Sequence, residues 1–179
     1  SEAARAITEK LCGRKIGAHF NHQGTIGLFR AAHAISEISG ENPLSVFEIG
    51  PGCGYVGAMI GLAGHRYASY DVTQGYYIWQ SRLLEHLFGE EFTEFAANPE
   101  ANFDNPSRMM HLPWWEFMNL YRGCTINADV VISNANLGEM NRDCLRYVIR
   151  IAKKMMENSP IALFIFASYG ESLSDRAII

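Results

Sequence analysis

Apolar positions along the chain follow two different periods, one typical of buried strands and one typical of helices. Short continuous apolar runs predict strands at residues 46–49, 67–71, 111–115, 129–133 and 161–166. Apolar residues at helical spacing predict helices at residues 55–62, 75–88 and 141–157. Because strands and helices alternate, we predict an α/β fold with a doubly wound, mostly parallel sheet and helices on both faces.

The start of the chain has a helical pattern and precedes the predicted sheet. We predict one helix over residues 1–11 and a second over residues 26–39, which Thr25 caps. The chain is therefore divided into an N-terminal helical segment, residues 1–43, and an α/β domain, residues 44–179.

Two stretches interrupt the alternation of strands and helices. Between residues 90 and 108 the pattern lapses, and Asn-Pro pairs with scattered charges predict a loop. Trp114 and Trp115 follow this loop beside Pro113. Paired tryptophans are costly to expose, so they are typical of a core or of a subunit contact, with a substrate platform as the alternative.

The last predicted strand, residues 161–166, is apolar and lacks the charges or proline that usually protect an edge. We therefore expect its edge to be covered by further residues or by a second subunit, as in a homo-oligomer.

Composition is that of an ordinary soluble globule, with 48% hydrophobic and 19% charged residues. The formal net charge is −4 without a basic block, so no nucleic-acid partner is expected. No apolar run approaches the ~20 residues that span a bilayer, so no membrane partner is expected. The four cysteines lack C-x-x-C spacing, which predicts free thiols in a reducing cytoplasm and no metal site.

A glycine-rich turn follows the first predicted strand. Glu48 lies near the end of that strand, and Gly50, Gly52 and Gly54 follow it at alternate positions. Glycines allow a sharp turn and the close approach of a ligand, and the helix at 55–62 directs its N-terminal N–H groups at the same turn. A strand, a close-approach loop and a helix N-terminus together predict a nucleotide-type site.

Two cofactor interpretations fit this turn. Residues 52–57 match the dinucleotide pattern G-x-G-x-x-G, with Asp71 about twenty residues further on for a ribose hydroxyl. This match is displaced from the strand end and leaves Glu48 unexplained. The alternative pattern is E-x-G-x-G-x-G, which runs from Glu48 to Gly54.

The second pattern resembles the first motif of class I S-adenosylmethionine-dependent methyltransferases, and the resemblance covers about residues 44–169. It implies a Rossmann-like domain that binds S-adenosylmethionine. It also implies that the glycine loop passes under the methionine part of the cofactor, while Asp71 holds the ribose. The family normally adds a helix and an antiparallel pair of strands, and too few residues follow 169 to supply them.

Three segments look like those of the sugar O-methyltransferases of bacterial surface-polysaccharide loci. They are residues 20–24, 47–54 and 112–115. This narrower resemblance implies methyl transfer to a hydroxyl of a sugar or small polar acceptor.

A sugar hydroxyl is a poor nucleophile, so such transfer needs a general base or a metal. His111 and Glu139 are candidate bases at the carboxyl edge of the predicted sheet, with His22 from the N-terminal loop. His111 contacting the adenine, Glu139 capping the next helix and His22 lying at the surface are the alternatives. Asn134 directly follows the fourth predicted strand and is a further cofactor-binding candidate, because open α/β sheets bind ligands at that edge.

Two other functions remain open at this point. A catalytically idle methyltransferase-like module, acting in binding or regulation, fits the short C-terminus and the lack of an obvious acid/base pair. An NAD-dependent oxidoreductase fits the dinucleotide pattern.

Overall fold

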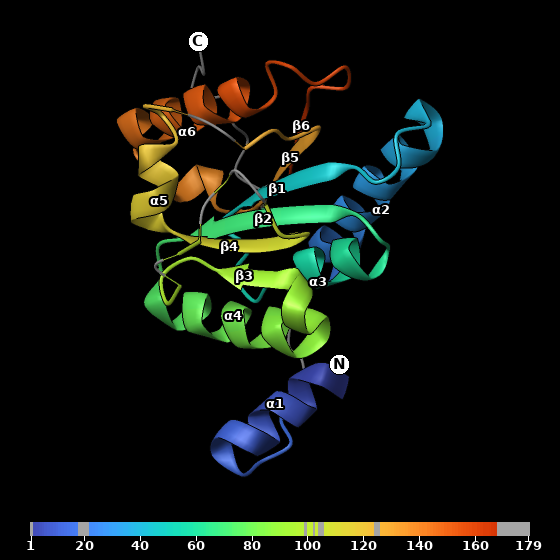
Figure 1. Cartoon of the computed structure of the whole chain (residues 1–179), viewed down its shortest axis with the longest axis vertical. Coiled ribbons are helices and arrows are strands. Elements are labelled where there is room, and N and C mark those ends of the chain that lie inside the picture. Colours follow the sequence, from blue (N-terminus) through green and yellow to red (C-terminus); the bar gives the residue numbers. More distant parts are fainter. Residues whose placement is uncertain are drawn as a thin grey trace.

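The computed structural model shows a six-stranded parallel sheet between two layers of helices (Figure 1). It describes residues 2–17, 22–98, 100–101, 103, 106–123 and 126–167. The strands are β1 Ser45–Ile49, β2 Arg66–Asp71, β3 Phe92–Glu94, β4 Met109–Pro113, β5 Val130–Asn134 and β6 Leu163–Ala167. Their order is β3-β4-β2-β1-β5-β6, and every pairing is parallel. The order reverses direction between β1 and β5, which makes the carboxyl ends of these strands a topological switch point.

Helices cover both faces of the sheet, as the alternating pattern predicts. The α-helices are α1 Glu2–Cys12, α2 His22–Ser39, α3 Tyr55–Leu62, α4 Gln74–Phe88, α5 Trp114–Asn119 and α6 Arg142–Met155, and two 3-10 turns are η1 Gly89–Glu91 and η2 Leu137–Glu139. Helices α2, α3 and α4 pack on one face of the sheet, and α5 and α6 pack on the other. Helix α1 packs on the outer side of α3 and α4 through Ile7 (Figure 1).

Two predicted helix boundaries are confirmed. Helix α3 has the predicted bounds. Asn141 caps α6, because its side chain accepts a hydrogen bond from the Cys144 N–H at 2.9 Å. These local signals come from glycine conformation and side-chain capping, which depend little on distant parts of the chain.

Other predictions are wrong, each because tertiary contacts outweigh a local signal. Residues 92–94 form the edge strand β3 instead of loop, because they pair with β4. Helix α2 begins at His22, so Thr25 lies inside the helix and is buried. Trp114 and Trp115 begin α5 and are 51% and 46% exposed, which excludes the core placement. Their role in a subunit contact remains a prediction.

Strand β6 ends the described sheet and pairs with β5. Its Leu163 and Phe166 side chains are 39% and 47% exposed. The covering of this edge by a second subunit or by further residues remains a prediction.

A close contact between α3 and β2 sets the position of α3 on the sheet. Gly57 lies in α3 directly over the ring of Tyr67, the second residue of β2. A Cβ atom at Gly57 would lie 2.2 Å from Tyr67 Cζ and 2.5 Å from its hydroxyl oxygen. Since the Tyr67 ring is fixed in the core, α3 can approach the sheet this closely only with glycine at position 57.

We therefore expect Gly57→Ala to lower the free energy of unfolding by about 2–3 kcal/mol, because the added methyl overpacks the core. Urea denaturation measures this change. Gly27→Ala in α2 is the matched control, because a Cβ there meets no atom within 4 Å. The control variant should be as stable as the wild type or more stable by up to about 1 kcal/mol. Equal stability of the two variants would contradict this account of the contact.

Candidate functional site

The turn after β1 has three glycines in the left-handed backbone region. The φ angles are +62° at Gly50, +56° at Gly52 and +71° at Gly54. The Gly50 N–H donates to the Tyr70 carbonyl at 3.1 Å, and the Gly54 N–H donates to the Pro51 carbonyl at 2.9 Å. Gly54 is the N-cap residue of α3 and offers no side-chain cap. The turn therefore passes directly in front of the N-terminus of α3, as the sequence predicts.

The three positions differ in what a side chain would meet there, and so in why glycine is needed. A Cβ at Gly50 would lie 1.7 Å from Asn136 Nδ2, and a Cβ at Gly54 would lie 3.0 Å from Gln80 Cγ. A Cβ at Gly52 would meet no atom within 4 Å. Gly50 and Gly54 are thus required by the packing of the protein itself, whereas Gly52 faces open space in which a ligand can approach the backbone.

Asn136 ties the two sides of the switch point together. Its Nδ2 donates to the Ile49 carbonyl at 2.7 Å, and its Oδ1 accepts a hydrogen bond from the Ser133 hydroxyl. This residue was not predicted from the sequence, although an amide two positions beyond a strand end was a usable signal. Asn134, which was predicted to bind cofactor, ends β5 at the same edge, and its Oδ1 is buried without a hydrogen-bond partner among the described residues.

Asp71 ends β2 beside the turn, as predicted, and is held from two sides. Its Oδ1 accepts from the Thr73 N–H at 2.8 Å, and its Oδ2 accepts from Gln80 Nε2 at 3.0 Å. The same Gln80 nitrogen donates to the Gly52 carbonyl at 2.5 Å. Gln80 therefore fixes the carboxylate of Asp71 against the glycine turn. Its signal in the sequence, a lone amide on the buried face of a predicted helix, was not recognised.

A row of polar side chains crosses the sheet beneath α4. Glu48 of β1, Ser69 of β2, His111 of β4 and Glu94 of β3 are in register on neighbouring strands. The first three side chains are fully buried. Glu48 Oε1, Ser69 Oγ and His111 Nε2 have no hydrogen-bond partner among the described residues. Such a row lowers the stability of a core and is unusual in a parallel sheet.

Glu48 is the titratable end of this row next to the glycine turn. Burial raises the pKa of Glu48 from its ordinary 4.5 to about 7, and the negative charge of Asp71 adds to the increase. The hydroxyl of Tyr67 donates to Glu48 Oε2 at 2.6 Å and acts in the opposite direction on the pKa. Near neutral pH the Glu48 carboxyl is therefore divided between its protonated and ionised forms.

His111 lies at the centre of β4 and not at the carboxyl edge where the sequence analysis placed it. Its ring stacks on Tyr77 of α4 with centroids 4.0 Å apart, and its Nδ1 lies 3.0 Å from Ser81 Oγ. Burial lowers the pKa of His111 to about 3, so the ring is neutral at physiological pH. The misplacement arose because the strand begins at Met109, two residues before the predicted start.

The other candidate bases lie on different elements. Glu139 is exposed in η2, just beyond the carboxyl end of β5. His22 is the first residue of α2, and its side chain lies outside the described part of the structure. The loop predicted around residues 20–24 is wrong for residues 22–24, which form the first turn of α2, and residues 20 and 21 lie outside the described part of the structure. The structure thus brings the glycines, Asp71 and Asn134 to one edge. Glu48 and His111 are buried in the same row inside the sheet, with Ser69 between them.

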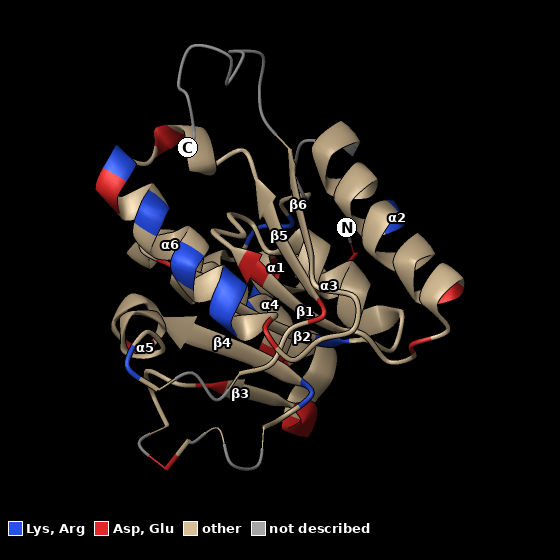
Figure 2. Ribbon diagram, turned by 90° about the horizontal axis from the view of Figure 1, so that it is seen from above, with Lys and Arg blue, Asp and Glu red and all other residues tan. Residues whose placement is uncertain are grey.

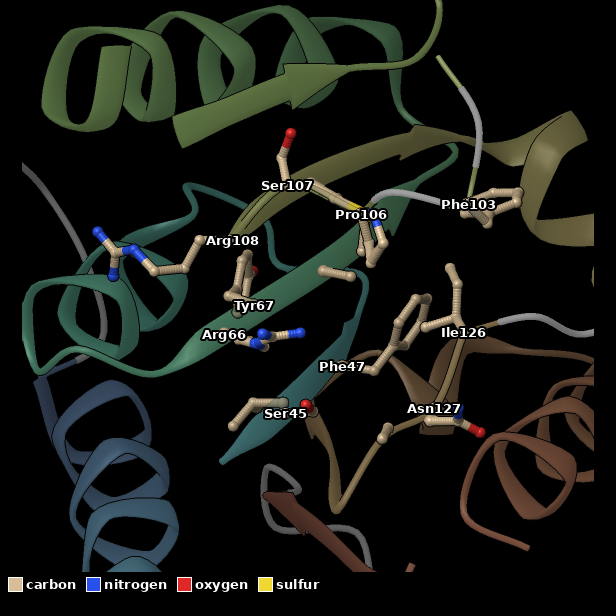
Figure 3. Close-up of a pocket in the computed structure, with 14 residues that line it drawn as sticks. Ser45, Phe47, Arg66, Tyr67, Phe103, Pro106, Ser107, Arg108, Ile126 and Asn127 are labelled. Atoms are coloured by element: carbon tan, nitrogen blue, oxygen red, sulfur yellow. The ribbon is translucent and has the colours of Figure 1, made fainter. Parts of the chain in front are cut away.

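A pocket of about 590 Å³ opens beside the glycine turn. It is lined by Ala4, Thr8, Ile16 and Gly17 from the N-terminal segment, Cys53 and Tyr55 after the turn, and Thr73, Gly75, Tyr76 and Trp79 from the start of α4. A smaller pocket of about 130 Å³ lies at the amino ends of the strands, where Arg66 and Phe47 contribute to its lining (Figure 3). Of these two pockets of the described residues, the larger one adjoins the turn.

The described residues contain neither a cluster of metal ligands nor a membrane-spanning helix. No three or more His, Cys, Asp or Glu side chains there come together in a group that could hold a metal ion. No helix in the same part of the chain is long and apolar enough to cross a membrane.

No protein-family model and no curated protein sequence matches this chain. Solved structures do. A SAM-dependent methyltransferase from Agrobacterium tumefaciens superposes with a TM-score of 0.57 at 14% identity, over 91% of this chain and 50% of that one. The magnesium protoporphyrin IX methyltransferase of Synechocystis PCC 6803, with bound SAH, superposes with a TM-score of 0.54 at 13% identity, over 87% of this chain and 62% of that one.

The bifunctional kinase-methyltransferase WbdD superposes with a TM-score of 0.55 at 13% identity, over 88% of this chain and 30% of that one. The chain has the class I methyltransferase fold. This fold confirms the predicted doubly wound parallel architecture. The chain spans about half the length of the Agrobacterium protein.

The raised pKa of Glu48 predicts a pH-dependent stability. Between pH 4.5 and 7 the unfolded chain loses the Glu48 proton while the folded chain keeps it, so stability falls as pH rises through this window. Glu48 should lower the free energy of unfolding of the wild type by about 3 kcal/mol between pH 4.5 and pH 8, and Glu48→Gln should lack this decrease. Urea denaturation of both proteins at pH 4.5 and pH 8 measures the difference.

His111 acts in the opposite direction, because its lowered pKa makes stability rise with pH between about 3 and 6.5. This contribution is common to the wild type and to Glu48→Gln, so it cancels in their difference. A stability difference that stays the same at both pH values would contradict the raised pKa of Glu48.

Proposed function

We propose that the chain is an S-adenosylmethionine-dependent methyltransferase whose cofactor lies on the turn after β1. The observation that carries this proposal is the open face of Gly52 in front of the α3 N-terminus, with Asp71 fixed beside it at the end of β2. The class I methyltransferase fold supports the same site. Each Asp71 oxygen can accept a second hydrogen bond, so both ribose hydroxyls can bind while Thr73 and Gln80 hold the carboxylate.

The dinucleotide alternative is the weaker one. Gly57, the third glycine of G-x-G-x-x-G, packs against Tyr67. This contact between helix and strand is compatible with either cofactor and does not distinguish them. The first motif residue Glu48 belongs to the polar row next to the turn, and the dinucleotide pattern gives it no place. The similarity to methyltransferase structures therefore favours the sulfonium cofactor.

The proposed reaction is methyl transfer to a hydroxyl of a sugar or small polar acceptor. When bound, the cofactor supplies an activated methyl group on its sulfonium. The residues of the chain then position the acceptor and exclude water. Tyr55, Tyr76 and Trp79 line the pocket beside the turn, and aromatic faces of this kind pack well on sugar rings.

Glu139 is the proposed general base. It is exposed at the carboxyl edge, three residues after Asn136. The Asn136 side chain is hydrogen-bonded to the end of β1. A carboxylate in this position can accept the proton of an acceptor hydroxyl while the methyl group is transferred. His111 is not proposed for this role, because its side chain is fully buried beneath α4.

The first test of the proposal is cofactor preference, measured by isothermal calorimetry with S-adenosylmethionine, S-adenosylhomocysteine and NAD. We expect the wild type to bind both sulfur nucleosides and not NAD. Gly52→Val should weaken binding by at least about a hundredfold, because the side chain fills the space that the ligand occupies.

Gly64→Val is the matched control for backbone strain. Gly64 also has a positive φ, +89°, and open space around its Cβ position, but it lies at the opposite end of α3. Both variants carry a similar strain of about 1–2 kcal/mol. Equal loss of affinity in the two variants, or binding of NAD alone, would refute the proposed cofactor site.

The second test is turnover, measured as S-adenosylhomocysteine release with a panel of sugars and nucleotide sugars. We expect Glu139→Gln to lower kcat by roughly 10²–10⁴ with little change in cofactor affinity, because only the proton acceptor is removed. Glu157→Gln, a change at an exposed carboxylate just beyond α6, is the control and should keep full activity.

Three outcomes would change the proposal. Equal activity of the wild type and Glu139→Gln would exclude Glu139 as the base. Turnover only with nitrogen acceptors would overturn the hydroxyl assignment. Cofactor binding without turnover on any acceptor would support the catalytically idle binding module instead.

A further inference from the structure

Helices α5 and α6 lie side by side on one face of the sheet. The Tyr147 hydroxyl donates to the Met118 carbonyl at 2.8 Å, and Lys154 Nζ donates to the Tyr121 carbonyl at 3.2 Å. The centroids of the Tyr121 and Tyr147 rings are 5.1 Å apart. We call the outer surface formed by residues 114–123 and 142–157 the α5–α6 face.

The α6 part of this face carries a row of positive charges. Arg142, Arg146, Arg150, Lys153 and Lys154 are all exposed, and their spacing places them along one side of the helix (Figure 2). The opposite side of α6 packs in the core through Val148, Ile151, Ala152 and Met155. Helix α6 therefore presents its charged side to solvent, while its apolar side is buried in the core.

The charges of the chain are strongly segregated. Six of its fifteen Lys and Arg residues lie in the α5–α6 face, against three of its nineteen Asp and Glu residues. The rest of the chain has nine basic and sixteen acidic residues. Asp143 lies 3.7 Å from Arg146 and offsets one of these charges, and the six basic and three acidic residues leave a net charge of +3 on the face. A positive face on a negative protein points to an anionic partner.

The α5 part of the face exposes large amphipathic and apolar side chains. Trp114, Trp115, Met118 and Tyr121 are 51%, 46%, 43% and 44% exposed. The two tryptophan rings meet edge to face, with centroids 5.8 Å apart. An exposed group of this size next to a charged row marks an interaction surface.

We propose that the α5–α6 face docks on an anionic lipid membrane surface. Tryptophan and tyrosine rings prefer the headgroup level of a bilayer, and Lys and Arg side chains are attracted to anionic headgroups. Because the apolar side of α6 is buried in the core, the helix lies on the headgroup layer without inserting into it. The expectation of no membrane partner rested on the lack of a spanning segment, which surface docking does not require.

This docking has a defined orientation. Trp114 directly follows Pro113, the residue of β4 that pairs with Asp71 at the carboxyl edge. Contact through the tryptophans therefore brings that edge of the sheet next to the lipid headgroups. Docking through this face does not depend on the proposed reaction.

The test is co-sedimentation of the chain with vesicles of phosphatidylcholine alone and of phosphatidylcholine containing a third phosphatidylglycerol. We expect binding to the anionic vesicles only, and weaker binding as salt is raised. Arg146→Gln combined with Arg150→Gln should weaken binding roughly 25-fold, since each basic residue near such a surface contributes about fivefold. Trp114→Ala combined with Trp115→Ala should weaken binding while its dependence on salt stays the same.

Lys10→Gln combined with Arg14→Gln is the matched control, because it changes the net charge equally at exposed residues in and just after α1. This control should bind anionic vesicles as the wild type does. Equal binding of the two charge variants would overturn the proposal, and so would equal binding to neutral vesicles. Binding of a DNA duplex without binding of anionic vesicles would also overturn it, in favour of a nucleic-acid surface.

Discussion

The hydrogen bond between the Tyr67 hydroxyl and the Glu48 carboxyl underlies the arrangement of the site. It is fully buried and joins β2 to the end of β1. The Tyr67 ring that makes it passes directly under Gly57, so the same contact fixes the distance of α3 from the sheet. Because α3 starts at the glycine turn, its N-terminus is positioned by this packing and not by a capping side chain.

Around this bond the fold accepts polar groups that a stable core would exclude. Glu48, Ser69 and His111 are buried in a row with unsatisfied atoms among the described residues, and the row ends next to the glycine turn. Buried polar atoms without partners lower stability, so proteins usually keep them only where a site requires them. Gln80 and Asn136 show the complementary arrangement, because each uses its hydrogen bonds to hold the turn in place. The glycine turn is therefore held in place by hydrogen bonds, and the buried polar row ends beside it.

The two faces of the sheet have different surroundings. The α3–α4 side carries the turn, the pocket and the polar row, whereas the α5–α6 side has an apolar core beneath a positively charged surface. The two sides meet at the carboxyl edge, where Pro113 pairs with Asp71 and Trp114 begins α5. The proposed docking surface and the proposed cofactor site can thus share one edge without sharing residues.

The sequence by itself determined the features that depend on local conformation. The run from Glu48 to Leu62 specified a strand, a left-handed glycine turn and a helix, because these signals act within a few residues. The alternation of strands and helices specified the parallel α/β fold for the same reason. Only the tertiary structure decided that His111 is buried, that β3 joins the sheet, and that Gln80 and Asn136 hold the turn. It also placed the α5 aromatics beside the α6 cations, which are separate in sequence. Each of these results depends on strand register or helix packing between distant segments, and no local pattern encodes such contacts.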